Sequence, residues 1–135
     1  DVHGLTEENF YTIALHHKKL IEEEIENGDS PLVFIDTEAI TTYIFGQMYI
    51  GKHEFHSESI MEIIVDQQFD LVLLCDVDVE WVDDGTRDFP HKRKEHLMEL
   101  QNTLTLLDVP YKMIRGDYAQ RYTLAKKYVN EIITK

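Results

Sequence analysis

The sequence has very few of the residues that cross-link a chain, embed it in a membrane or keep it unfolded. Cys75 is the single cysteine among 135 residues, so no disulfide can form within the chain, which fits a reducing compartment. No apolar run approaches the roughly 20 residues of a membrane span, and no signal peptide is visible. Six glycines and three prolines are too few for a disordered or fibrous chain. With 43% hydrophobic residues, the chain is predicted to form one globular domain over residues 1–135. The single cysteine and the lack of a visible signal peptide predict a cytoplasmic location.

Positive charge is also scarce. The chain has 13 Lys and Arg and 26 Asp and Glu, which gives a formal net charge of −13 with neutral His. Such a field disfavours nucleic acid or an anionic membrane surface as partners. A nucleotide stays compatible, because a few amides, one Arg or Lys and Mg²⁺ can hold its phosphates. The chain begins at Asp1 rather than Met, which indicates a fragment or a processed piece.

Helical periodicity accounts for most of the chain. Thr6 is typical of a helix N-cap and Gly28 of a helix stop, so residues 6–27 are predicted as one long helix. Asp117 is the expected N-cap of the last helix. The four further helices are predicted at about 38–49, 57–67, 91–107 and 117–133.

Three short apolar runs separate these helices, at residues 31–36, 69–76 and 109–114. Runs that are apolar on both faces are typical of parallel strands covered on both sides, so Cys75 is expected to be buried. The expected fold is therefore α/β, with a three-layer parallel sheet and helices on both faces. In such sheets functional residues lie at the carboxyl ends of the strands.

The first run ends at Asp36, which is followed by Thr37 and Glu38. An apolar strand that ends in Asp has the form of a Walker B element, in which the strand fixes a carboxylate that holds Mg²⁺ or a metal-bound water. Alternatively, Asp36 caps the helix that begins near Glu38 by accepting hydrogen bonds from its first amides. The pattern alone leaves both interpretations open.

The second run leads through "DVD", residues 76–78, into "EWVDDGTRDF", residues 80–89, which holds the single Trp of the chain. One interpretation is a plain turn at Asp-Asp-Gly, with Trp81 as a core anchor at its base. Another is a pocket for a cation, because the Trp81 ring face and the carboxylates of Asp83 and Asp84 attract positive charge.

Arg87 follows, and residues 92–94 then form the densest basic run of this acidic chain. The run is compatible with simple charge balance on the first half of a helix. Basic side chains at a helix start nevertheless oppose the helix dipole, which points to a nearby anion such as phosphate. The residues alone thus indicate nucleotide or phosphate chemistry with a cationic acceptor.

Three segments together resemble one known family: "FIDTEAITTYIFGQMYIG", "FDLVLLCDVDVEWVDDGTRDF" and "VPYKMIRGDYAQRYTLA". They resemble the ribosylnicotinamide kinase domain of the NadR-type multifunctional NAD-biosynthesis proteins, from about Phe34 to the C-terminus, and the Trp-Val-Asp-Asp-Gly-x-Arg string is the most specific part. The resemblance implies a P-loop kinase fold. It also implies an enzyme that uses ATP and Mg²⁺ to phosphorylate the 5′-hydroxyl of nicotinamide riboside, which gives nicotinamide mononucleotide.

The resemblance also implies roles on the phosphate side of the reaction. Asp36 matches the Walker B-like carboxylate, as a Mg²⁺ ligand or as the group that activates the acceptor hydroxyl, with Glu38 beside it for the substrate. Arg87, and less closely Arg93, resemble lid arginines that reach the transferred phosphate.

On the acceptor side, Trp81 resembles the aromatic residue that stacks on the cationic nicotinamide ring. Asp83 and Asp84 are expected to accept hydrogen bonds from the ribose hydroxyls or to complement the pyridinium charge. The small-molecule substrate implied is therefore nicotinamide riboside, and no nucleic acid or membrane partner is expected.

The chain departs from the family pattern in one respect. The phosphate loop G-x-x-x-x-G-K-[ST] does not occur in these 135 residues, so the chain matches the later part of such a domain, without its first strand. These residues alone are expected to bind ATP poorly and to catalyse little. Two alternatives stay open: a non-catalytic module that senses a nicotinamide nucleoside, and a P-loop kinase for another nucleoside or nucleotide. The oligomeric state is left open.

Overall fold

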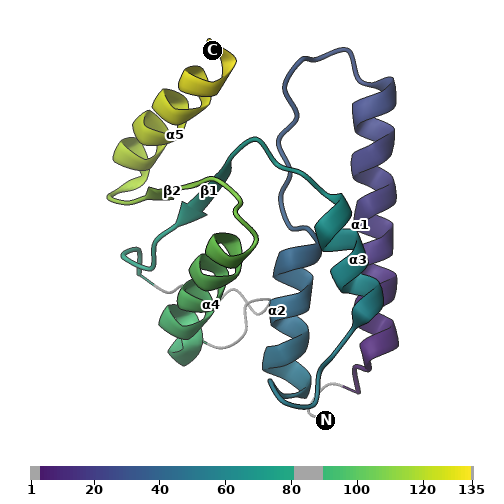
Figure 1. Cartoon of the computed structure of the whole chain (residues 1–135). Helices are drawn as coiled ribbons and strands as arrows, with labels where there is room; N and C mark the ends of the chain where they lie inside the picture. Colours follow the sequence, from purple (N-terminus) through teal and green to yellow (C-terminus); the bar gives the residue numbers. More distant parts are fainter. Residues whose placement is uncertain (1–3, 81–89, 135) are drawn as a thin grey trace. The chain divides into compact units, whose positions relative to one another are not determined.

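The computed structural model describes residues 4–80 and 90–134. The chain divides into two compact units, Asp1–Gln67 and Gln68–Lys135. Its elements, in chain order, are α1 (Glu7–Asn27), α2 (Ala39–Ile50), α3 (Glu58–Asp66), β1 (Val72–Cys75), η1 (Pro90–Lys92), α4 (Arg93–Leu106), β2 (Tyr111–Ile114) and α5 (Tyr118–Ile133) (Figure 1). The α/β class and all the predicted helices are therefore confirmed. No helix of the described part combines the length and the apolar character that crossing a membrane requires.

Helix α1 begins and ends at the residues that the sequence indicates. The Asn9 N–H donates to the Thr6 hydroxyl at 3.3 Å, and the Thr6 N–H donates to Asn9 Oδ1 at 2.8 Å, which makes a capping box. At the other end the Gly28 N–H donates to the Glu24 carbonyl at 2.9 Å. Both ends of the helix are thus fixed by local hydrogen bonds, which is why the sequence predicts them well.

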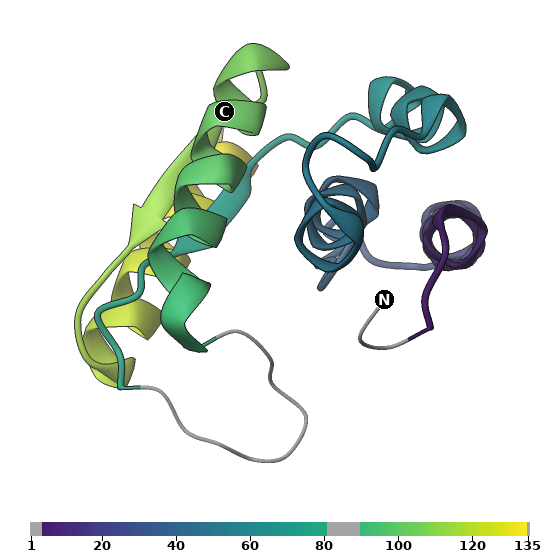
Figure 2. The same ribbon diagram turned by 90° about the horizontal axis from the view of Figure 1, so that it is seen from below.

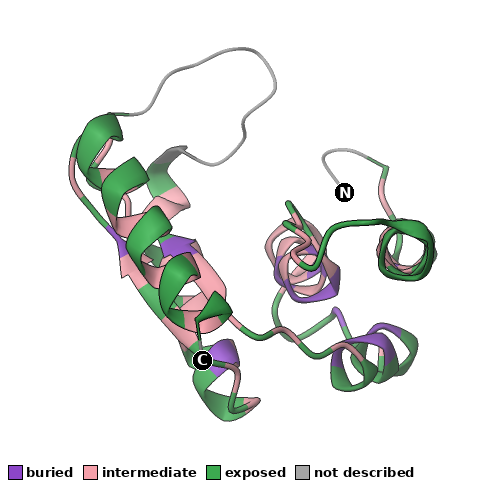
Figure 3. Cartoon of the chain, turned by 90° about the horizontal axis from the view of Figure 1, so that it is seen from above, coloured by how far each residue is buried: buried purple, intermediate pink, exposed green. Residues whose placement is uncertain are grey.

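The first unit is packed around Phe55. The Phe55 ring meets the rings of Phe10 and Tyr43 edge-on, with centroids 5.6 and 5.1 Å apart. Gly46 leaves room for this ring, because a Cβ atom there would lie 2.4 Å from Phe55 Cζ. The remaining buried apolar residues among those described in this unit are Ala14, Ala39, Ile40, Ile44, Ile60, Ile63 and Ile64. Figure 3 shows buried stretches of the helices in purple.

The prediction of a strand at residues 31–36 is wrong. This segment is irregular and makes no strand pairing with any described residue, and Phe34 is 71% exposed. A strand persists only where a neighbouring backbone pairs with its N–H and C=O groups. The apolar run has the composition of a strand, but no described segment supplies its partner.

The second unit contains a two-stranded parallel sheet. β1 and β2 pair from Val72 against Tyr111 onward, and α4 lies between them in the chain, as a parallel connection requires. Figure 2 shows the two strands lying between α4 and α5. The buried residues among those described in this unit are Leu74, Leu104 and Ile114. A wider three-layer sheet and a single domain over residues 1–135 stay predictions.

Cys75 lies in β1, as predicted, but it is exposed rather than buried. Its neighbour Leu74 is 6% exposed, because successive side chains of a strand point to opposite faces. The apolar run predicted that side chains on both faces of this strand are buried. At this end of β1 only the Leu74 side chain is buried, and Cys75 on the opposite face is exposed.

Candidate functional site

The carboxyl ends of β1 and β2 bring acidic and basic side chains together. Cys75 and Ile114 are register partners, and the next N–H, that of Asp76, donates to the Ile114 carbonyl at 2.9 Å. Asp76 and Arg115 therefore leave the sheet next to each other. Arg115 Nε lies 2.7 Å from Asp76 Oδ2, which is a charge-assisted hydrogen bond.

A second ion pair connects β1 to α5. The Asp78 carboxylate accepts hydrogen bonds from the Arg121 guanidinium and, at 2.7 Å, from the Gly116 N–H. Gly116 has a φ of 102°, and a Cβ atom there would lie 2.3 Å from Gln120 Oε1, so this position favours glycine. Asp117 caps α5, as predicted, by accepting from the Gln120 N–H at 2.8 Å.

The pKa of each of the two carboxylates after β1 lies below its ordinary value, which favours the ionised form. The Arg115 hydrogen bond is the main cause that lowers the pKa of Asp76, and the Gly116 N–H is the main cause that lowers the pKa of Asp78. Each acid is also paired with an arginine, Asp76 with Arg115 and Asp78 with Arg121. Within residues 4–80 and 90–134, no group of three or more His, Cys, Asp or Glu is arranged to hold a metal ion.

Sequence reasoning noted the acids at 76 and 78 and missed their partners. The contact of Arg115 could have been predicted, because Arg115 directly follows the third apolar run as Asp76 follows the second, and the two runs pair in parallel. The contacts of Arg121 could not, because they reach 43 and 45 residues back along the chain.

Arg93, predicted as a lid arginine, is the first residue of α4. Its terminal guanidinium nitrogen donates to the Val79 carbonyl at 2.5 Å, and the residue is half-buried. Lys92, in the basic run of residues 92–94, is the N-cap residue of α4, and its side chain makes no capping hydrogen bond. Arg93 thus anchors the chain that follows β1, and its contact with a phosphate stays a prediction.

Glu38, rather than Asp36, is the N-cap of α2. Its carboxylate accepts from the Ile40 N–H at 2.7 Å and from the Thr41 N–H at 3.1 Å. The interpretation of Asp36 as the cap is therefore wrong, because the longer Glu side chain two residues later already reaches these amides. Asp36 is exposed, and Thr37 after it has a φ of 69°, which is rare for a β-branched residue.

Four predicted site residues lie outside the described residues: Trp81, Asp83, Asp84 and Arg87. Their roles stay predictions. The described chain stops at Glu80, one residue after the carbonyl that Arg93 binds, and resumes at Pro90.

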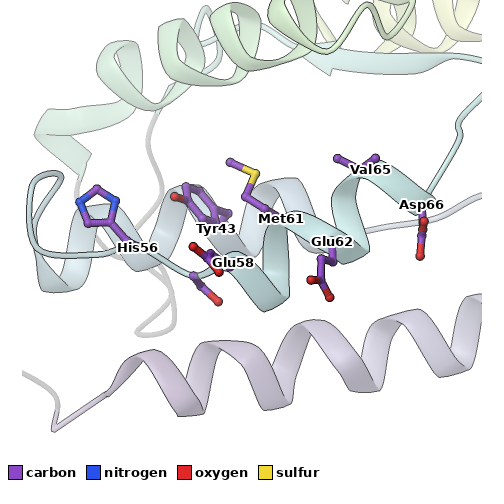
Figure 4. Close-up of a pocket in the computed structure, with 8 residues that line it drawn as sticks. Tyr43, His56, Glu58, Met61, Glu62, Val65 and Asp66 are labelled. Atoms are coloured by element: carbon purple, nitrogen blue, oxygen red, sulfur yellow. The ribbon is translucent and has the colours of Figure 1, made fainter.

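The first unit carries a surface pocket of about 850 Å³ that the sequence did not indicate (Figure 4). Met61 and Val65, one helical turn apart on α3, give it an apolar part, and they are 37% and 68% exposed. The lining residues are Tyr43, His56, Ser57, Glu58, Met61, Glu62, Val65 and Asp66. None of the described predicted site residues lines it.

Comparison with known proteins gives concordant matches. A family described as AAA domain matches residues 5–121. The trifunctional NAD biosynthesis/regulator protein NadR of Salmonella typhimurium is 33% identical over 88 residues, which cover 64% of this chain and 20% of that protein. The protein of the same name from Escherichia coli is 29% identical over 125 residues, which cover 90% of this chain and 29% of that protein. The chain thus spans less than a third of the length of these curated relatives.

Proposed function

The chain belongs to the AAA domain family and is a NadR-type kinase-like domain, and from that premise we propose that it acts in the phosphorylation of nicotinamide riboside by ATP. The observation that carries the proposal is the similarity to NadR over 90% of this chain. The Trp-Val-Asp-Asp-Gly-x-Arg string, on which the resemblance noted in the sequence is most specific, supports it. The product is nicotinamide mononucleotide, a step of NAD salvage.

Asp36 is the proposed Mg²⁺ ligand. Mg²⁺ keeps several waters and is held by one or two carboxylates together with substrate phosphates, so a dedicated protein cage is not required. The exposed carboxylate of Asp36, free of hydrogen bonds to other described residues, fits that kind of binding. When bound, the metal supplies charge neutralisation for the transferred phosphate. Glu38 supports this position by fixing the first turn of α2, since its carboxylate is engaged as the helix cap.

The acceptor side rests on the segment after β1. We assign Trp81 to stacking on the cationic nicotinamide ring, where a ring face attracts positive charge. Asp83 and Asp84 would bind the ribose hydroxyls, and Arg87 with Arg93 would neutralise the transferred phosphate. Phosphoryl transfer depends mainly on such positioning and charge neutralisation.

These 135 residues are expected to transfer phosphate slowly by themselves, because they contain no G-x-x-x-x-G-K-[ST] sequence to cradle the ATP phosphates. Riboside binding is therefore the direct test. In calorimetric titration the chain should bind nicotinamide riboside, and Trp81→Ala should weaken that binding by about 1–2 kcal/mol. Trp81→Phe is the matched control and should retain most of the affinity. Equal affinity in all three proteins would overturn the assignment of Trp81.

The same missing sequence favours a second candidate, a non-catalytic module that senses a nicotinamide nucleoside. The two functions differ in their response to the phosphate donor. A kinase should bind riboside more tightly, or turn it over, when ATP and Mg²⁺ are added to a form that carries a phosphate loop. A sensor should show the same riboside affinity with and without them.

A further inference from the structure

Helix α3 presents two faces of different character. One face is buried in the core of the first unit through Ile60, Ile63 and Ile64. The other face carries the residues of α3 that line the surface pocket, which are Glu58, Met61, Glu62, Val65 and Asp66. Their spacing of three and four residues places them together on one side of a helix. Because the buried face anchors α3, the outer face is held in place before any ligand binds.

The outer face of α3 combines an acidic row with an apolar row. Glu58, Glu62 and Asp66 follow one another at intervals of four residues, and Met61 and Val65 do the same beside them. Figure 4 shows Met61 and Val65 on one side of α3, with Glu62 and Asp66 on the other. Met61 is 37% exposed and Val65 is 68% exposed, so the apolar row is open to a ligand.

The pocket attracts positive charge. Its described lining contains three carboxylates and one imidazole, that of His56, and no Lys or Arg. Among the described residues, no Lys or Arg forms an ion pair with Glu58, Glu62 or Asp66. Glu7 brings a further carboxylate close to the pocket, because it accepts a hydrogen bond from the His56 N–H at 2.9 Å. A ligand with several positive charges therefore complements this face.

The length and openness of the face favour an elongated ligand. Eight residues separate the first and last acids of the row, which is about 12 Å along a helix, so the acids do not converge on a single ion. Small-molecule pockets enclose most of their ligand, whereas Val65 is mostly exposed. A second copy of this chain is disfavoured, because each copy has a net charge of −13. Amphipathic helices do bind open grooves through rows of this spacing.

We propose that the pocket on α3 is a docking surface for a basic amphipathic helix of a partner protein. Lys or Arg side chains on successive turns of that helix would pair with the acidic row, and its apolar side chains would cover Met61 and Val65. The proposal is independent of riboside phosphorylation, because none of the described residues assigned to that reaction lines the pocket.

The test uses a fluorescein-labelled helical peptide of about 15 residues, with a row of Lys, an adjacent row of Leu and Ala elsewhere. Binding to the full chain is followed by fluorescence anisotropy at about 0.15 M salt, which screens distant charges. The triple variant Glu58→Gln/Glu62→Gln/Asp66→Asn should raise the peptide Kd about tenfold, because it removes three partly exposed ion pairs. Met61→Ser should raise it about fivefold, as expected for the loss of an apolar contact.

A matched control changes three exposed acids of α1 that lie outside the pocket lining. The variant Glu23→Gln/Glu24→Gln/Glu26→Gln alters the net charge by the same amount and should change the peptide Kd by less than about twofold. An equal loss of affinity in the two triple variants would overturn the proposal, because the peptide would then respond only to net charge. No binding of the peptide to the unaltered chain would overturn it as well.

Two further measurements locate the bound peptide and identify the kind of ligand. In nuclear magnetic resonance spectra the amide signals of residues 56–66 should shift on peptide addition, and shifts that spare these residues would overturn the proposal. If circular dichroism shows that the triple variant is unfolded, the single variant Glu62→Gln and Met61→Ser decide instead. Binding of the small cation benzyltrimethylammonium, without binding of the peptide, would assign the pocket to a small molecule and overturn the docking role.

Discussion

Two segments of this chain share one sequence design, an apolar run that ends in Asp, and they fold differently. Residues 72–75 form a strand paired with β2, and the Asp76 that follows is bound by Arg115. Residues 31–35 form no strand, and the Asp36 that follows is exposed. The difference lies in what each run meets: β1 has a parallel partner, and the earlier run has none among the described residues.

This difference bears on chemistry as much as on fold. The carboxylates after β1 are neutralised by arginines and serve the structure of the strand ends. Asp36 is left exposed, and its neighbour Glu38 has taken over the capping of α2. Of the described acids that end these two runs, Asp36 is therefore the better candidate for binding a cation.

The largest expected effect comes from truncating one apolar residue in each run. Leu74→Ala should lower the free energy of unfolding by about 2–5 kcal/mol, because the Leu74 side chain in β1 is buried. Phe34→Ala should change it by less than about 0.5 kcal/mol, because Phe34 is mostly exposed. Urea denaturation followed by circular dichroism measures both. A loss at Phe34 as large as that at Leu74 would mean that the run at 31–36 is packed like a strand.

The next effect tests whether helix packing holds the first unit. Gly46→Ala should cost about 1–3 kcal/mol, because the added Cβ atom would press on the Phe55 ring. Gln47→Ala, one residue later in α2, should cost much less. Equal denaturation midpoints for these two variants would contradict the packing around Phe55.

A smaller effect separates Glu38 from Asp36. Glu38→Ala removes the N-cap of α2 and should lower the free energy of unfolding by about 1 kcal/mol. Asp36→Ala should change it by less than about 0.5 kcal/mol, yet it should abolish the Mg²⁺-dependent activity of a form that carries a phosphate loop. Thermal melts and a phosphoryl-transfer assay measure the two effects. A lower thermal midpoint with unchanged activity in Asp36→Ala would mean that Asp36 has a structural role.

The smallest effect is the acid dependence of the β1 end. Because the pKa values of Asp76 and Asp78 are lowered from 3.8 in the folded chain, their ionised forms stabilise it above pH 3.8. That stabilisation is lost as the pH falls through the lowered pKa values. The variant Asp76→Asn/Asp78→Asn should therefore lose less stability between about pH 5 and about pH 2 than the unaltered chain. Asp36→Asn is the control and should lose as much stability over this pH range as the unaltered chain. A reduced loss of stability in Asp36→Asn, equal to that of the double variant, would mean that the acids after the two runs do not differ.

The elements that the sequence predicts correctly are those defined locally. Thr6, Gly28 and Asp117 cap their helices through partners within four residues, and the helical periodicity lies in the same windows. The α/β class follows from the alternation of such helices with two apolar runs that pair. Local sequence did not decide which acid caps α2, because Asp36 and Glu38 both lie close to the first amides of the helix.

The features that the sequence could not predict depend on distant contacts. A strand at residues 31–36 required a partner that local composition does not supply. The exposure of Cys75 depends on which face of β1 is covered. The contact of Arg121 with Asp78 joins residues that only the parallel register of β1 and β2 brings together. The sequence therefore indicated the acids that follow β1 but not the arginines that bind them.

The proposed function requires that this acidic chain recognises a cationic riboside. Calorimetric titration with nicotinamide riboside and with its reduced form, dihydronicotinamide riboside, tests it most directly, because the two molecules are close in shape and differ in the positive charge of the ring. The oxidised form should bind at least about tenfold more tightly, and Trp81→Ala should remove most of that difference. Equal affinity for the two forms, or no binding of either, would contradict the account.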